Sequence, residues 1–214
     1  MKLYSYFRSS AAYRVRIALN VKGLNYEYVA KHLLRDGGEH KRADYLEINP
    51  QGFVPALEHN GALITQSVAI IEYLDEVFPT PSLLPKRPVD RAIVRAMSLL
   101  IACDIHPLNN LRVLNYLKSP LGQSGEATAD WYKHWIAEGF AALERMLVKY
   151  SIEGRYCFGD AVTMADVLLV PQVANSRRYQ MELTSYPTLK KVASHLESLP
   201  AFFGARPEAQ PDAE

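Results

Sequence analysis

The spacing of hydrophobic and polar positions divides the chain into a first part with strands and helices and a second part with helices alone. Residues 2–7 are rich in aromatic side chains and alternate loosely, which predicts a short strand. From residue 10 onward, apolar side chains recur at helical spacing up to Gly23, where we expect the helix to stop. Residues 25–30 alternate again and predict a second strand, so this region forms a βαβ unit with parallel strands.

The next region predicts a hairpin. Residues 32–49 are polar and highly charged, which indicates a loop with a short helix. The apolar stretches 56–59 and 62–65 flank Asn60-Gly61, a pair that favours a two-residue type I′ turn. The sequence therefore predicts two antiparallel strands joined by this turn.

A second helix is predicted over residues 67–76, and it completes the arrangement of a thioredoxin-like α/β domain over residues 1–80. Pro55 stands at the first position of the third strand, where a cis bond is possible although base rates favour trans. Dithiol redox proteins of this fold carry a cysteine at the head of the first helix. Residues 9–12 are Ser, Ser, Ala and Ala, so a reactive sulfur must come from a cosubstrate.

Strand patterns end at the proline-rich stretch 81–88, which we interpret as a linker. Residues 89–214 are predicted to form an all-helical domain with an irregular tail from Gly204. Thr163 and Asp166 form a capping box at the head of a buried helix, and we interpret both as structural. The helices of this second domain are expected over residues 90–105, 109–117, 130–150, 163–179 and 187–199.

Composition excludes several classes of protein. With 214 residues, 49% hydrophobic and 22% charged, the chain has the composition of an ordinary globular protein. Its 24 basic and 23 acidic residues balance to +1, so we expect neither nucleic acid nor an anionic membrane as a partner. No membrane span or signal peptide is expected. Cys103 and Cys157 are too few for a disulfide framework or a metal site, and a cytoplasmic location is the expectation.

Two predicted helices begin directly after a strand, and each carries serine at its start. Ser9 and Ser10 precede the first helix, and Gln66 and Ser67 precede the second. The N–H groups and partial positive charge of a helix start favour an anion, and the same field lowers the pKa of a thiol. Two such ends predict a site for a ligand with separated anionic groups. A serine here can also serve only as a helix cap, and that alternative stays open.

A group of polar residues interrupts the otherwise apolar first helices of the second domain. It consists of Asp104, His106, Asn110 and Arg112, and Pro107 should break the helix beside it. Such a group forms either a satisfied network in the core or one wall of a cleft. The pattern favours neither.

These motifs together resemble the cytosolic glutathione transferases over essentially the whole chain, most closely the zeta class. Zeta proteins carry Ser-Ser-Cys-x-x-Arg at the first helix, and here Ala11 stands in the cysteine position before Arg14. No role that depends on that thiol is therefore expected. CDIHP at 103–107 and Arg112 look more like bacterial maleylpyruvate isomerases, a sister branch. The resemblance rests on YSYFRSS..YRVRIAL at 4–19, NPQGFVPAL at 49–57, QSVAIIEYL at 66–74, VTMADVLLVPQVAN at 162–175 and SYPTL at 185–189.

The resemblance implies that the first domain binds glutathione and that the chain forms a homodimer. Backbone of Val54, before a cis Pro55, would pair with the cysteinyl part of glutathione, and Ser9 and Ser10 would stabilise its thiolate together with Arg14. Arg8, Arg112 and Arg178 are the implied residues for a dicarboxylate substrate. The implied glutathione contacts are Ser9, Ser10, Ala11, His40, Gln51, Val54, Pro55, Gln66, Ser67, His106, Asn110 and Arg112.

The implied activity is cis–trans isomerisation of maleylacetoacetate to fumarylacetoacetate in tyrosine and phenylalanine catabolism. Three alternatives remain: isomerisation of maleylpyruvate, transfer of glutathione to α-halo acids and other electrophiles, and a glutathione-binding protein without catalysis. The arginines favour a dianionic substrate, because guanidinium binds carboxylates through paired hydrogen bonds. The serines at both helix starts argue against a purely structural role.

Overall fold

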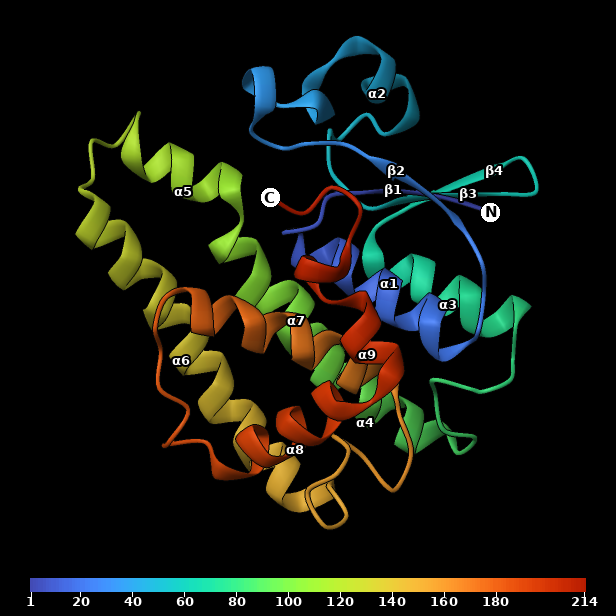
Figure 1. Ribbon diagram of the computed structural model, residues 1–214. Coiled ribbons are helices and arrows are strands. Elements are labelled where there is room, and N and C mark those ends of the chain that lie inside the picture. Colours follow the sequence, from blue (N-terminus) through green and yellow to red (C-terminus); the bar gives the residue numbers. More distant parts are fainter. The chain divides into compact units, whose positions relative to one another are not determined.

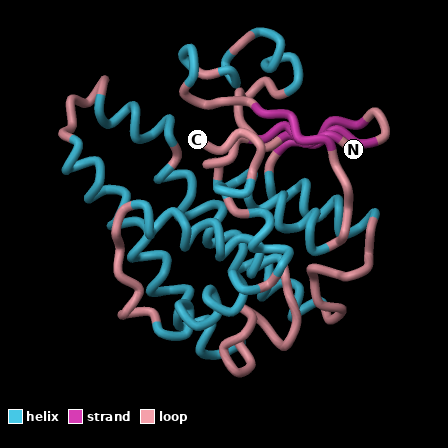
Figure 2. The backbone as a smooth tube through the Cα atoms, in the orientation of Figure 1, coloured by secondary structure: helices cyan, strands magenta, loops and turns pink.

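The computed structural model describes residues 1–214, which form two compact units. The first comprises Met1–Ser82 together with Ser198–Glu214, and the second comprises Leu83–Glu197. All strands lie in the first unit, whereas the second is entirely helical (Figure 2). This is the predicted fold class, a thioredoxin-like α/β unit and an all-α unit.

The first unit is built on one four-stranded sheet. Its strands are β1 (Lys2–Ser5), β2 (Glu27–Ala30), β3 (Ala56–His59) and β4 (Ala62–Thr65), in the order β2-β1-β3-β4. Strands β1 and β2 are parallel, and the other two pairs are antiparallel. The predicted βαβ unit and hairpin are both confirmed.

Local sequence explains the turns of this sheet. Asn60 and Gly61 have φ values of 51° and 78°, as a type I′ hairpin turn requires. Gly23, with φ of 64°, follows the C-cap of the first helix, as predicted. The Val54–Pro55 bond is cis, and so is Thr80–Pro81.

Helices cover both faces of the sheet (Figure 1). Helices α1 (Ser10–Val21) and α3 (Ser67–Val77) pack against each other on one face, whereas α2 (Ala43–Ile48) lies on the other. Helix α1 also contacts α9 (Pro200–Ala205) along its length. Its apolar residues, among them Val15 and Leu19, are fully buried between these elements.

The second unit is a bundle around one buried helix. In α7 (Met164–Arg178), the run from Met164 to Val170 is almost entirely inaccessible to solvent. Asp166 caps this helix as predicted, because its carboxylate accepts hydrogen bonds from the N–H and hydroxyl of Thr163. The other helices are α4 (Pro88–Leu99), α5 (Leu111–Lys118), α6 (Gly125–Tyr150) and α8 (Pro187–Ser198).

The segment Pro88–Lys118 confirms the predicted break beside Pro107 and differs from one other prediction. An 18-residue window in it reaches a mean hydropathy of 1.2, which meets the length and composition of a membrane span, although no apolar run of that length was expected. The segment is not one regular helix, because a π-helical turn over Leu100–Ile105 and a 3-10 turn over His106–Asn109 interrupt it. Met97 and Ile101 are fully buried in the bundle, so one face of this segment packs in the core.

The C-terminal segment corrects the predicted domain division. Residues 198–214 were assigned to the helical domain, but they belong to the first unit. The tail was also predicted to be irregular from Gly204, whereas α9 continues through Ala205 and a 3-10 turn follows at Pro207–Ala209. Burial of Phe202 and Ala205 against α1 explains this order, and no periodic pattern in so short a segment announces it.

Candidate active site

The first helix start combines a capped end with accessible groups. Ser9 is the N-cap of α1, and its Oγ accepts a hydrogen bond of 3.2 Å from the N–H of Ala12. A hydroxyl that accepts in this way keeps its own proton for a second partner. Ser10 is buried, and Ala11 is partly exposed. The cap and the anion-binding roles of Ser9 are therefore compatible.

A buried cation donates a hydrogen bond to the first residue of the second helix. Ser67, the first residue of α3, accepts a 3.2 Å hydrogen bond from Nη1 of Arg14, which is 1% exposed. Gln66 is the N-cap and has φ of 69° and ψ of 118°, an unusual backbone for a residue other than glycine. Such a conformation costs about 1–3 kcal/mol and is typical of functional positions. The Gln66 side chain donates to Oε1 of Gln51 at 2.7 Å.

The loop before Val54 is held by residues that the sequence analysis did not single out. Asn49 is 2% exposed; its Nδ2 donates to the carbonyl of Phe53 at 2.7 Å, and its Oδ1 accepts from the N–H of Gln51 at 3.1 Å. The hydroxyl of Tyr45 donates to the same Phe53 carbonyl at 2.7 Å. These bonds fix the backbone directly before Val54. A buried asparagine in a turn was the available sequence signal.

His40 lies in a confined environment in the same unit. It is 8% exposed, and burial lowers the pKa of its imidazole, an effect that the charge of Lys41 reinforces. A Cβ atom at Gly38, which has φ of 105°, would overlap the imidazole. The close approach of backbone to the ring therefore requires glycine at this position.

A second buried arginine of α1 holds the loop that leads to Ser9. Arg16 is fully buried, and its guanidinium donates to the carbonyls of Tyr6 and Phe7 at 3.3 and 3.1 Å. It also donates to the Ser5 hydroxyl at 3.2 Å. Charged residues within an apolar helix were a signal in the sequence, but the loop that Arg16 would support was not predictable from it.

The helical unit carries the remaining predicted residues. Asn110 is the N-cap of α5, and its side chain accepts from the N–H of Arg112 at 3.1 Å. Its observed role is thus to cap the helix that presents Arg112, an exposed residue. His106 is half-buried in the preceding 3-10 turn.

Arg178 lies at the end of α7 and is exposed. Burial raises the pKa of the nearby Tyr132, and the positive charge of Arg178 offsets part of this increase. Tyr132 in turn stacks on Tyr179 with 3.7 Å between ring centroids. The Arg178 charge therefore lies near a stacked aromatic pair.

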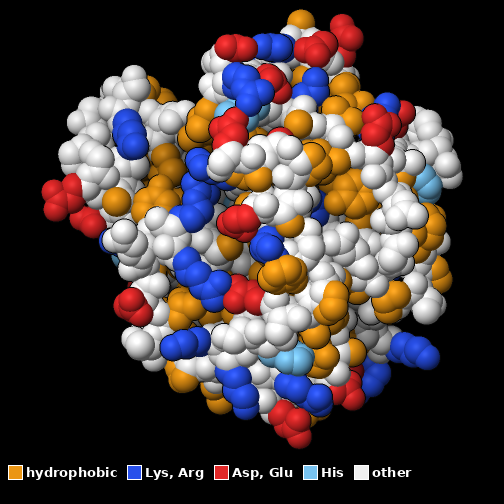
Figure 3. Space-filling view, in the orientation of Figure 1, with side chains coloured by type: hydrophobic (Ala, Val, Ile, Leu, Met, Phe, Trp, Pro, Cys, Tyr) orange, Lys and Arg blue, Asp and Glu red, His pale blue; other side chains and the backbone are white.

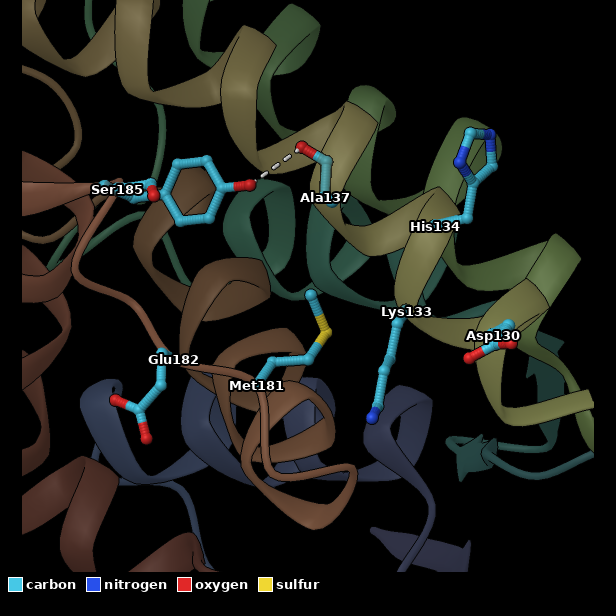
Figure 4. Close-up of a pocket in the computed structure, with 8 residues that line it drawn as sticks. Asp130, Lys133, His134, Ala137, Met181, Glu182 and Ser185 are labelled. Carbon is cyan, nitrogen blue, oxygen red and sulfur yellow. Dashed lines mark hydrogen bonds between the residues drawn. The ribbon is translucent and has the colours of Figure 1, made fainter. Parts of the chain in front are cut away.

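One surface pocket of the helical unit lies apart from these residues. A surface pocket of about 380 Å³ lies between α6 and the segment before α8, and the hydroxyl of Tyr186 crosses it to the Ala137 carbonyl (Figure 4). None of the predicted residues lines it. On the face shown in Figure 3, acidic and basic side chains are interspersed, as the net charge of +1 leads one to expect.

The first unit therefore gathers two groups of predicted residues. Gln51, Gln66, Ser67 and Arg14 form a connected group at the start of α3. Ser9, Ser10 and Ala11 form the start of α1, which packs against α3. This arrangement supplies two positive helix ends and hydroxyl groups for an anionic ligand.

Comparison with known proteins agrees with this geometry. Residues 1–76 match the family described as "Glutathione S-transferase, N-terminal domain", and residues 112–202 match "Glutathione S-transferase, C-terminal domain". A protein of Vibrio cholerae described as a probable maleylacetoacetate isomerase is 51% identical over 211 residues, which cover 99% of this chain and 97% of the relative.

Solved structures match over similar lengths. One, described as the holo form of maleylpyruvate isomerase, a bacterial zeta-class glutathione S-transferase, has a TM-score of 0.96 and 46% identity, with 100% of both chains covered. A Methylobacterium extorquens maleylacetoacetate isomerase with bound malonate and glutathione has a TM-score of 0.94 and 39% identity, again with 100% of both chains covered. An Anaeromyxobacter dehalogenans maleylacetoacetate isomerase with bound dicarboxyethyl glutathione and citrate has a TM-score of 0.87 and 39% identity. The match covers 100% of this chain and 97% of that chain.

The chain belongs to the glutathione S-transferase family. Within that family its full-length similarity is to zeta-class proteins described as maleylacetoacetate and maleylpyruvate isomerases.

Proposed function

We propose that this protein is a glutathione-dependent cis–trans isomerase that converts maleylacetoacetate to fumarylacetoacetate, a step of tyrosine and phenylalanine catabolism. The observation that carries the proposal is the link between the two helix starts, in which Arg14 supports Ser67 while Ser9 caps α1. Its relatives include isomerases with glutathione and dicarboxylates bound.

Glutathione would bind the first unit through groups at separate ends of the tripeptide. Gln66 and Ser67 would hold the γ-glutamyl carboxylate at the start of α3, where the buried charge of Arg14 adds to the helix field. The backbone of Val54, before the cis bond to Pro55, would pair with the cysteinyl residue. His40 and Gln51 would contact the remaining part of the molecule.

The thiol of glutathione would lie at the start of α1. Ser9 keeps a hydroxyl proton that it can donate to sulfur, and the partial positive charge of the helix end favours the thiolate. Ser10 and Ala11 lie in the same turn, where Ala11 supplies no thiol of its own. The protein thus uses the sulfur of its cosubstrate as nucleophile.

The reaction then needs only addition, rotation and expulsion. The thiolate forms a C–S bond with one carbon of the cis double bond, and the displaced electron pair moves to the conjugated carbonyl as an enolate. The former double bond is now single and rotates. The enolate electrons re-form the double bond in trans geometry and expel the sulfur, so glutathione leaves unchanged.

Arginine side chains would bind the substrate carboxylates and stabilise the enolate. Arg8 lies one residue before Ser9, so it is adjacent to the proposed thiolate. Arg112 and Arg178 are exposed on the helical unit, and His106 and Asn110 lie in the same segment as Arg112. We assign Arg8, Arg112 and Arg178 to the dicarboxylate.

We further propose a cytoplasmic homodimer. Both cysteines are free thiols, and the reaction requires glutathione in its reduced form, which suits a reducing compartment. Large apolar side chains are exposed in each unit, with Leu63 and Val77 in the first and Val89 and Leu99 in the second. The homodimer rests on the family resemblance, and these side chains are the candidates for its apolar contacts. Sedimentation of the wild type and of Leu63→Glu tests it.

The second candidate substrate is maleylpyruvate, since the solved structure with a TM-score of 0.96 is described as an isomerase of that compound. The test is an assay of purified protein with both substrates in parallel at saturating glutathione. A higher kcat/KM for maleylacetoacetate supports the proposal, and a higher value for maleylpyruvate selects the alternative. If neither turns over while α-halo acids are conjugated, the protein is a general transferase.

A further inference from the structure

The last five residues of the chain, Gln210–Glu214, return to the sheet of the first unit (Figure 1). We call this segment the C-terminal strap. Its Asp212 carboxylate is shared between two donors: Oδ2 accepts from the N–H of Phe7 at 3.1 Å, and Oδ1 accepts from the hydroxyl of Tyr28 at 2.6 Å. Phe7 is one residue before Arg8 and two before Ser9.

The terminal residue binds a second loop. One carboxylate oxygen of Glu214 lies 2.7 Å from Nη2 of Arg35 and 3.5 Å from Nε2 of His32. His32 is 8% exposed, and its Nδ1 accepts from the N–H groups of Leu34 and Arg35. The loop that begins at His32 leads to His40, the proposed glutathione contact.

The loop between β1 and α1 is therefore held from both sides. On the core side, the guanidinium of Arg16 donates hydrogen bonds to the carbonyls of Tyr6 and Phe7. On the other side, the carboxylate of Asp212 in the strap accepts a hydrogen bond from the N–H of Phe7. Burial lowers the pKa of Arg16, and the negative charge of Asp212 opposes that shift. Asp212 and Arg16 thus hold the same loop through different backbone groups.

The strap is not needed to attach the C-terminal segment. Helix α9 is already fixed to α1 by hydrogen bonds from Tyr13, Arg16 and Asn20 to carbonyls at positions 202, 205 and 201. Residues 210–214 lie beyond this anchor and are bound to two loops, both of which carry residues of the proposed glutathione site.

We propose that the C-terminal strap is a positioning device for the thiolate site, with Asp212 as its principal positioning residue. Asp212 sets the loop that presents Arg8 and Ser9, and Glu214 sets the loop that leads to His40. The assignment of the site rests on the proposed function, but the control of both loops by the strap does not.

The test compares Asp212→Asn with Glu208→Gln, an exposed residue of the preceding 3-10 turn. The two donors bind different carboxylate oxygens, and asparagine replaces one of these oxygens with an NH₂ group and removes the charge, so in the observed geometry at most one donor keeps its acceptor. Three quantities are measured: amide hydrogen exchange over residues 6–10, the pKa of the thiol of bound glutathione from its thiolate absorbance, and kcat at saturating glutathione. Asp212→Glu tests rescue by a carboxylate, and the melting temperature of each variant tests folding.

For Asp212→Asn we expect faster exchange over residues 6–10 with unchanged exchange in β1, a raised pKa of the bound thiol, and a kcat about tenfold lower. Asp212→Glu should recover part of each effect, and Glu208→Gln should show none. If a folded Asp212→Asn protein shows unchanged amide exchange over residues 6–10, an unchanged pKa of the bound thiol and an unchanged kcat, the proposed positioning role of the strap is wrong. If exchange rises as expected but the wild type neither binds glutathione nor isomerises, the proposed function fails and the positioning of the loops stands.

Discussion

Nη1 of Arg14 donates a 3.2 Å hydrogen bond to Oγ of Ser67, which joins the second turn of α1 to the first residue of α3. Arg14 is buried, and a guanidinium stays protonated even there. Its charge therefore adds to the partial positive charge of the α3 start. One bond thus connects the helix assigned to the sulfur with the helix assigned to the carboxylate of glutathione.

Substitution of Ser67 should weaken glutathione without unfolding the protein. Ser67→Ala removes a hydroxyl that orients Arg14 and would contact the ligand. A net loss of about 1.4 kcal/mol corresponds to a roughly tenfold higher Kd. Titration calorimetry with glutathione measures it.

Thr65→Ala is the matched control, because this partly exposed hydroxyl lies two residues earlier on β4. It should bind glutathione as the wild type does. Equal affinity of Ser67→Ala and the wild type would remove Ser67 from the site.

Gly38→Ala should displace His40. A Cβ atom there would overlap the imidazole, and φ of 105° is unfavourable for alanine. We expect a several-fold higher Kd for glutathione, with Gly37→Ala as the control, since no atom lies near its Cβ position. Gly37 also has a positive φ, so this control accounts for part of the backbone strain, whereas a Cβ atom at Gly38 would approach the Leu33 carbonyl as well as His40. Identical affinities of the two variants would contradict the proposed contact.

His40 also predicts a pH dependence. Burial lowers the pKa of its imidazole below the unfolded value of about 6.5, so the unfolded chain binds more protons as pH falls through that value. The free energy of unfolding should therefore decrease as pH falls below about 6.5. His40→Gln should make this dependence shallower in urea titrations across that range. A slope equal to that of the wild type would show that His40 does not contribute.

Asp166 should be among the most sensitive positions for stability. Its buried carboxylate accepts from the N–H of Cys157 at 2.6 Å and from the N–H and hydroxyl of Thr163 at 2.7 and 2.8 Å. Burial raises its pKa, an effect that these hydrogen bonds oppose. Asp166→Ala should lower the free energy of unfolding by about 3 kcal/mol or more. Asp160→Ala, at an exposed carboxylate, should change it little, and equal losses would contradict this role.

Arg178 and its neighbour Arg177 offer a direct test of the substrate assignment. Arg177 forms a bidentate ion pair with Glu197, whereas Arg178 is assigned to the substrate. Arg178→Ala should reduce kcat/KM for dicarboxylates about a hundredfold, as loss of a charge-assisted contact of about 2–3 kcal/mol predicts. Arg177→Ala should leave it nearly unchanged. Similar values for both variants would mean that Arg178 does not bind the substrate.

Much of the fold could be predicted from the sequence because its signals are local. Asn60-Gly61 determines its hairpin, the residues from Ser67 to Val77 keep helical periodicity, and Thr163 with Asp166 marks the start of α7. Serines at the two helix starts likewise indicated the anion site.

The remainder depends on contacts that are distant along the chain. No sequence pattern near Asp212 predicts its hydrogen bond with Phe7, 205 residues earlier. Likewise, no pattern near Arg16 predicts which carbonyls it binds. The left-handed backbone of Gln66 also follows from its surroundings, because glutamine has no intrinsic preference for it. The sequence therefore indicated candidate site residues but not the framework of buried contacts around them.

The most direct test of the proposed isomerase mechanism measures the trans product and the free thiol of glutathione in the same reaction. Purified protein is mixed with glutathione and maleylacetoacetate, and the trans product and the glutathione thiol are quantified at intervals. The proposed mechanism predicts many turnovers with a constant amount of free thiol and no product without glutathione. Loss of one thiol per product formed, or turnover without glutathione, would contradict it.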